Sequence, residues 1–119
     1  MKFRTVTPVF QVADLARAIA FYRDVLGFDV AWQWGEPPHI ASVCSDPVEI
    51  VLLIVEQPVA SYAIVNMEGV DEYFARVVKA GAREIVPLAD RLYGMRDGRI
   101  ADLDGNQLSF GQPLAAAAS

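Results

Sequence analysis

One order of elements runs through this chain twice, and that repeat restricts its fold more than any other feature of the sequence. Residues 5–12 are rich in β-branched and aromatic side chains and lead into a helical pattern that ends at Gly27. Residues 62–67 lead in the same way into a second helical pattern, which ends at Gly81. Glycine suits the left-handed residue that closes a helix. Three more strands follow each glycine, so both halves are predicted to run strand, helix, strand, strand, strand.

In the first half, Asp14 is the expected N-cap of a helix over residues 15–26, where apolar side chains recur at helical spacing. The next strand, residues 28–34, alternates apolar and polar side chains. This alternation predicts that Phe28, Val30, Trp32 and Trp34 share one face. The remaining strands of this half are expected at residues 40–44 and 48–55.

In the second half, the helix is expected over residues 70–80. The strand over residues 93–101 is expected to be interrupted at Asp97-Gly98, because glycine weakens the interior of a strand. The other strands are expected at residues 83–88 and 107–111.

The chain of 119 residues has the size of one domain, but each half of roughly 55 residues would bury little apolar surface alone. We therefore expect a single domain over residues 1–119 made of two modules that share a core or use a partner chain. Module one covers about residues 1–57 and module two about residues 58–113. A flexible, alanine-rich tail is expected at residues 114–119.

Charge and composition exclude several classes of partner. Hydrophobic residues make up 54% of the chain, but no run approaches the roughly 18 apolar residues of a membrane span. Ten basic and fifteen acidic residues give a net charge of −5, and no Lys/Arg cluster is present, so we expect neither a membrane nor a nucleic-acid partner. The acidic balance favours a cationic ligand. The N-terminus lacks a secretory signal pattern, which makes a cytoplasmic location the expectation.

Residues 8–30, "PVFQVADLARAIAFYRDVLGFDV", and residues 102–110, "DLDGNQLSF", closely resemble the vicinal oxygen chelate superfamily. This superfamily includes glyoxalase I, bleomycin resistance proteins and extradiol dioxygenases. The resemblance implies an α+β fold of two βαβββ modules, the glyoxalase/bleomycin resistance/dihydroxybiphenyl dioxygenase fold. In this fold the sheets are cupped around a cavity, and the chain often forms a homodimer.

The resemblance also implies where a metal would bind, because metal enzymes of the superfamily carry His, Glu or Gln ligands on the first and last strands of each module. Those positions hold Thr7, Val51, Tyr62 and Ser109 here. None is an imidazole or a carboxylate, the donors that transition metals prefer in oxygen and nitrogen sites. We therefore expect no metal and no cofactor, and no catalytic residue is identified.

Candidate ligand-binding residues follow from strand alternation and from the resemblance. A strand residue two away from a former metal position shares its face, which brings in Glu49 from the fourth strand. Glu49 faces either a cationic ligand or solvent, and the two tryptophans form either an aromatic wall for a ligand or part of a core or dimer contact. The full set of candidates is Gln11, Trp32, Trp34, Glu49, Tyr62, Tyr93, Met95, Arg96, Gln107 and Ser109.

Three functions remain open from the sequence. The first is a metal-free, bleomycin-resistance-like binding protein that sequesters an aromatic or cationic antibiotic or metabolite. The second is an enzyme of the same superfamily, a lyase, isomerase or dioxygenase, with a displaced or non-metal centre. The third is an interaction module with a collapsed cavity.

Overall fold

The computed structural model describes residues 1–114, and the predicted tail at 115–119 lies outside the described residues. The chain divides into two compact units, one ending at Val59 and the other beginning at Ala60. We call them module one and module two and describe each by itself. Across the described residues, no helix is long and apolar enough to cross a membrane.

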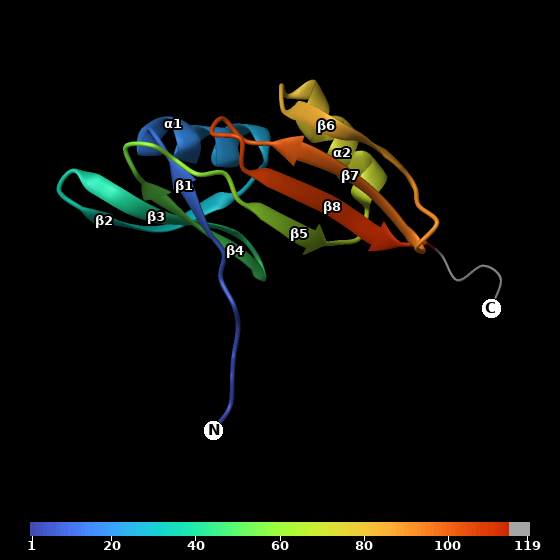
Figure 1. Cartoon of the computed structure of the whole chain (residues 1–119), viewed down its shortest axis with the longest axis horizontal. Helices are drawn as coiled ribbons and strands as arrows, with labels where there is room; N and C mark the ends of the chain where they lie inside the picture. The colour runs from blue at the N-terminus through green and yellow to red at the C-terminus, as the bar shows by residue number, and fades with distance from the viewer. Residues whose placement is uncertain (115–119) are drawn as a thin grey trace. The chain divides into compact units, whose positions relative to one another are not determined.

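Module one contains one sheet and one helical segment (Figure 1). The sheet has the order β1-β4-β3-β2, in which β1 pairs with β4 in parallel and the other pairs are antiparallel. The elements are β1 (Val9–Val12), α1 (Leu15–Ala20), the π-helix η1 (Phe21–Val25), β2 (Asp29–Gly35), β3 (Pro38–Ser45) and β4 (Val48–Ile54).

Module two repeats this arrangement with the strand order β5-β8-β7-β6, again with the outer pair β5 and β8 parallel (Figure 1). The same order of elements and the same sheet topology in both modules confirm the predicted pair of βαβββ modules. The elements are β5 (Tyr62–Asn66), α2 (Val70–Lys79), β6 (Arg83–Asp90), β7 (Met95–Ala101) and β8 (Gln107–Pro113).

Each module buries its apolar side chains between its helix and one face of its sheet. In module one, Ile19 and Tyr22 of the helical segment are buried together with sheet residues such as Leu52. In module two, Phe74 and Val77 of α2 are buried together with Leu108, Phe110 and other sheet residues. The opposite face of each sheet, which we call the open face, is not covered by the module's own helix.

The first helix differs from the prediction in its second half. It is α-helical only over Leu15–Ala20 and continues as the π-helix Phe21–Val25. The amide of Leu26 donates to the carbonyl of Phe21 at 3.2 Å, which is the wider hydrogen bond of a π-helix. Asp14 caps the start as predicted, since its side chain accepts from the Arg17 amide at 3.0 Å.

The first strand is shorter than predicted. It begins at Val9, and the preceding residue contributes only its carbonyl, which accepts from the Val51 amide at 3.0 Å. Pro8 has no amide hydrogen to donate to a ladder, which explains why regular pairing starts after it.

The prediction that Phe28, Val30, Trp32 and Trp34 share one face is wrong. Val30 pairs with Val43, but Trp32 pairs with Ser42, so Ala31 is an extra residue in β2. Such a bulge shifts the alternation of side chains by one. Phe28 and Val30 therefore lie on the helix-covered face, and the two tryptophans lie on the open face.

The predicted interruption of β7 at Asp97-Gly98 is also wrong, because β7 is continuous over Met95–Ala101. Gly98 is buried in the middle of the strand, and a Cβ atom there would lie 2.7 Å from the ring of Phe74 on α2. The glycine is thus required by close packing of the helix on the strand, and it does not break the strand.

Candidate functional site

The open face of each module carries the candidate residues, and the strand pairing shows which of them are neighbours. Residues paired across a ladder point to the same side of the sheet. In module one, Val51 of β4 pairs with Val9 of β1 and Ser42 of β3, and Ser42 pairs with Trp32 of β2. These four residues form one row across the open face.

Two tryptophans stand at the β2 side of this face. Trp32 and Trp34 keep 44% and 68% of their surface exposed. The ring of Trp34 meets the ring of His39 edge to face, with 5.1 Å between centroids. His39 lies at the start of β3, where it is exposed and supports a tryptophan ring. Large exposed aromatic rings on one strand offer a stacking surface to a planar molecule.

Glu49 lies on the same open face within a group of three polar side chains, which we call the Glu49 trio. Its carboxylate accepts from Thr7 Oγ1 at 3.4 Å and from Ser42 Oγ at 2.5 Å. Glu49 is half-buried, and within residues 1–114 it forms no ion pair with a Lys or Arg. Its negative charge is therefore solvated only by hydroxyl groups and the remaining water.

Gln11 also lies on the open face of module one, because it pairs with Leu53 of β4, two residues from Val51. Its side-chain carbonyl accepts from the Val59 amide at 2.9 Å. This bond ties β1 to the segment that ends the module, so Gln11 has a structural contact as well as a place on the face.

The open face of module two forms a pocket of about 650 Å³. All the residues around it belong to this module, and both polar and apolar side chains contribute. Of the sequence candidates, it gathers Tyr62, Tyr93, Met95 and Ser109. The complete lining is Tyr62, Ile64, Asn66, Val86, Arg91, Tyr93, Met95, Asp97, Gly98, Arg99, Ser109 and Gly111.

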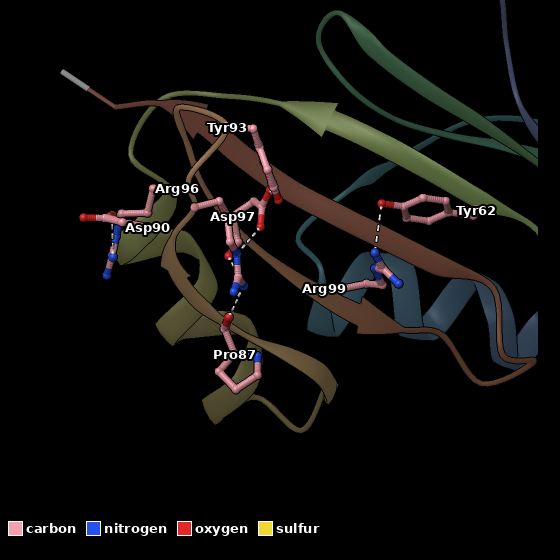
Figure 2. Close-up of polar contacts among 8 residues, drawn as sticks. Tyr62, Pro87, Asp90, Tyr93, Arg96, Asp97 and Arg99 are labelled. Atoms are coloured by element: carbon pink, nitrogen blue, oxygen red, sulfur yellow. Dashed lines mark hydrogen bonds and ion pairs between the residues drawn. The ribbon is translucent and has the colours of Figure 1, made fainter. Parts of the chain in front are cut away.

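Arg99 of β7 lies at the centre of this face, where it pairs with Ser109 of β8. Its Nη1 donates to Gln107 Oε1 and its Nη2 donates to the Tyr62 hydroxyl, each at 3.3 Å. The guanidinium also lies 4.6 Å from the centroid of the Tyr62 ring. Figure 2 shows this contact beside β8. We call Tyr62, Arg99 and Gln107 the Arg99 trio.

A second polar cluster surrounds Asp97. The carboxylate accepts from Tyr93 Oη at 2.6 Å and from Arg91 Nε at 2.9 Å (Figure 2). Burial alone would raise the pKa of Asp97, but the hydrogen bonds from Tyr93 and Arg91 and the charges of Arg91 and Arg99 outweigh it and lower the pKa. The hydrogen bond to Asp97 in turn raises the pKa of Tyr93.

Arg96 lies on the opposite side of β7 from this pocket. Its guanidinium forms ion pairs with Asp71 in the first turn of α2, at 2.7 Å, and with Asp90 of β6, at 3.0 Å. Figure 2 shows Arg96 beside Asp90 and apart from Arg99. The ion pairs connect β7 with α2 and β6 on the helix-covered side, so the structure does not bring Arg96 together with the other candidates.

The two trios occupy equivalent positions in their modules. Val51 pairs with the parallel strand β1 and with Ser42 of β3, just as Ser109 pairs with the parallel strand β5 and with Arg99 of β7. Ser42 therefore corresponds to Arg99. Glu49 lies two residues before Val51, and Gln107 lies two residues before Ser109. Glu49 therefore corresponds to Gln107.

The residues at the superfamily's metal positions do not fit a metal ion. Thr7 and Tyr62 offer neutral hydroxyls that already take part in the trios, Val51 offers no donor atom, and Ser109 offers one buried hydroxyl. Within the part of the chain that the structure describes, no three His, Cys, Asp or Glu side chains gather in a way that could hold a metal. We therefore derive no chemistry through a metal.

Three charged residues of the module-two pocket, Arg91, Asp97 and Arg99, were not among the sequence candidates. Alternate residues of a strand share one face, so a strand that presents Tyr93 and Met95 to the pocket also presents Asp97 and Arg99. The sequence therefore contained the information needed to include them. The expected interruption at Asp97-Gly98 concealed it.

Comparisons with known proteins agree with this architecture. The sequence model of the Glyoxalase/Bleomycin resistance protein/Dioxygenase superfamily matches residues 4–110. A search of curated proteins finds no match. Among solved structures, TioX from Micromonospora sp. ML1 is 23% identical, with a TM-score of 0.83 over 94% of this chain and 100% of that one. A bleomycin resistance determinant encoded on the transposon Tn5 is 15% identical, with a TM-score of 0.81 over 93% and 98% of the two chains. At these identities the structures are similar to this chain in fold.

Proposed function

The chain belongs to the Glyoxalase/Bleomycin resistance protein/Dioxygenase superfamily, and from this premise we propose that it is a metal-free binding protein for a small aromatic molecule. The observation that carries this proposal is the open face of module one. It presents two exposed tryptophans on β2 and, beyond β3 on β4, a half-buried carboxylate that has no cationic partner among the described residues. Binding sites for small molecules combine an apolar or aromatic wall with a few polar groups in this way.

The ligand's charge at module one follows from Glu49. A half-buried carboxylate is stabilised by a cation that replaces lost water. A cationic group is also attracted to the faces of tryptophan rings. We therefore propose that module one accepts a planar ligand with a positive group, as an antibiotic or a metabolite. The resistance named for the transposon Tn5 determinant is consistent with such sequestration.

Tryptophan fluorescence tests this proposal directly, because both tryptophans of the chain lie in module one. Titration with a panel of cationic planar drugs is expected to quench the emission saturably. Trp32→Ala and Trp34→Ala should each weaken the binding. Gln33→Ala is the matched control, because Gln33 lies between them on the opposite face, where it pairs with Ala41. A response that does not saturate with any compound of a broad panel would overturn the proposal and favour an interaction module.

The alternative is an enzyme of the superfamily with a displaced centre. Metal analysis of protein purified without chelator separates the two. We expect no stoichiometric Ni, Zn, Fe or Mn, whereas about one metal ion per chain would contradict the metal-free proposal.

We propose further that both modules form one domain and that the chain works as a cytoplasmic homodimer. Light scattering on the purified protein should then give twice the chain mass of 13.0 kDa. A mass of one chain at working concentration would exclude the dimer.

A further inference from the structure

Arg99 has unused hydrogen-bonding capacity in the module-two pocket. A guanidinium carries five N–H donors. The side-chain hydrogen bonds of Arg99 go to two neutral oxygens, each at the long distance of 3.3 Å. Its Nε is buried and has no acceptor within the described residues. A buried donor without an acceptor costs free energy, so the protein alone satisfies this guanidinium incompletely.

The charges around the pocket leave Arg99 without a counter-ion. The other cation, Arg91, is paired with Asp97 at 2.9 Å, and the second carboxylate oxygen of Asp97 accepts from Tyr93. No ion pair joins Arg99 to any acidic side chain in residues 1–114. Two guanidinium groups and one carboxylate among the lining residues give this pocket a net charge of +1.

This arrangement selects a chemical class of ligand. The flat edge of a guanidinium, with parallel N–H groups, matches the two oxygens of a carboxylate. The pocket's single excess positive charge balances a monoanion. The surrounding side chains of Tyr62, Ile64 and Val86 offer ring and aliphatic surface for the rest of a planar molecule.

We propose that the open face of module two binds the carboxylate of an aromatic acid through the guanidinium of Arg99. This inference rests on the proposed function, since it assigns a ligand class to a second face of a small-molecule-binding protein. The two sites differ in the ligand charge that they favour, which is positive at module one and negative at module two.

Three probes with one ring system test the charge preference: naphthalene-2-carboxylate, its neutral carboxamide and the corresponding naphthylmethylammonium. Calorimetry should give at least tenfold tighter binding for the carboxylate than for the carboxamide. Amide NMR shifts should change around β5, β7 and β8 when the carboxylate binds. The ammonium probe should not perturb these strands.

Two substitutions locate the effect. Arg99→Gln should remove the tenfold preference, and Arg99→Lys, which keeps the charge but loses the planar edge, should retain only part of it. Arg96→Gln is the matched control, because it removes an arginine from the same strand on the opposite face. The amide spectrum of each variant shows whether it is folded.

The outcomes separate this inference from the proposed function. Equal affinity for carboxylate and carboxamide, or an undiminished preference in Arg99→Gln, would overturn the inference. If the tryptophans still respond saturably to cationic planar drugs in that case, the proposed function stands without it. If the carboxylate preference depends on Arg99 while the tryptophans respond to no compound, the inference stands for module two and the cation site of module one is excluded.

Discussion

The two modules share one sheet topology but carry opposite charges at equivalent strand positions. In module one, a β3 hydroxyl, Ser42, donates to the β4 carboxylate of Glu49. In module two, a β7 guanidinium, Arg99, donates to the β8 amide oxygen of Gln107. Each contact joins the same two strand positions. One trio is left with a net charge of −1 and the other with a net charge of +1.

The shared topology therefore does not determine which charges the open face carries. The helix-covered face must be filled to the density of a protein interior, so its residues are constrained by volume. A polar residue on the open face needs only hydrogen-bonding partners, so a donor and its acceptor can be replaced together by another donor and acceptor. Four substitutions test this difference between the modules.

The largest effect is expected from Gly98→Val, which acts on the helix-covered face. Gly98 pairs with Phe110, and the equivalent residue of module one is Ala41, which pairs with Leu52. Any Cβ at Gly98 would lie 2.7 Å from the Phe74 ring. We expect a loss of about 3 kcal/mol in the free energy of unfolding from overpacking. Urea denaturation measures it.

The control for that substitution is Ala41→Val at the equivalent position of module one. Both variants add bulk to a fully packed strand, so equal losses would mean that the Gly98 contact with Phe74 is not the special constraint proposed here.

Asp97→Asn should have the next largest effect, because it removes a charged acceptor at a position where module one carries Ile40. The loss of charge-assisted hydrogen bonds from Arg91 and Tyr93 is expected to cost about 2 kcal/mol at pH 7. The folded-state pKa lies below the usual 3.8, so this stabilisation is complete above that pH and is lost as the pH falls through the folded-state pKa.

Urea denaturation of both proteins from pH 7 into that acidic range measures the difference. The gap between wild type and Asp97→Asn should narrow as the pH falls. A gap that stays constant would show that the carboxylate charge does not contribute.

Glu49→Gln makes the Glu49 trio more like the Arg99 trio, because the equivalent residue of module two is Gln107. Thr7 and Ser42 donate to different oxygens of the carboxylate, so in the glutamine one hydroxyl still donates to the amide oxygen while the other accepts from the amide nitrogen, and we expect little change in stability. Affinity for a cationic planar drug should fall about tenfold, or about 1.4 kcal/mol. The tryptophan titration measures it, and unchanged affinity would remove Glu49 from the cation site.

The smallest effect is expected from Tyr93→Phe, which removes one hydroxyl donor and keeps the ring. Asp97 retains Arg91 and Tyr93 is exposed, so the loss of unfolding free energy should be smaller than that of Asp97→Asn. With one donor fewer, the pKa of Asp97 should rise, and NMR titration of its carboxyl carbon measures the change. An unaltered pKa would mean that Tyr93 does not hold the carboxylate in solution.

The sequence predicted the parts of this structure that depend on local chemistry. Both helix-ending glycines have positive φ, 77° at Gly27 and 110° at Gly81, as the left-handed turn requires. The repeat of elements and the Asp14 cap follow from periodicity and from side-chain hydrogen bonding along the chain. These features need no knowledge of distant contacts.

The parts that it missed depend on contacts between distant segments. Nothing near Gly98 in the sequence shows that Phe74 packs against it, so the glycine was interpreted as a strand break. Arg99 has the appearance of an ordinary surface charge until the register places it between Tyr62 and Gln107. Ala31 likewise gives no local sign that it is the additional residue of a bulge.

That bulge has a consequence for which side chains β2 exposes. Ala31 lies between Phe28 and Val30, which are on the helix-covered side, and Trp32 and Trp34, which are on the open face. An insertion of one residue is enough to create this division, because it reverses the side on which every later side chain of the strand emerges. Substitutions of Trp32 and Trp34 therefore alter the exposed surface of β2 and leave the packing beneath the sheet in place.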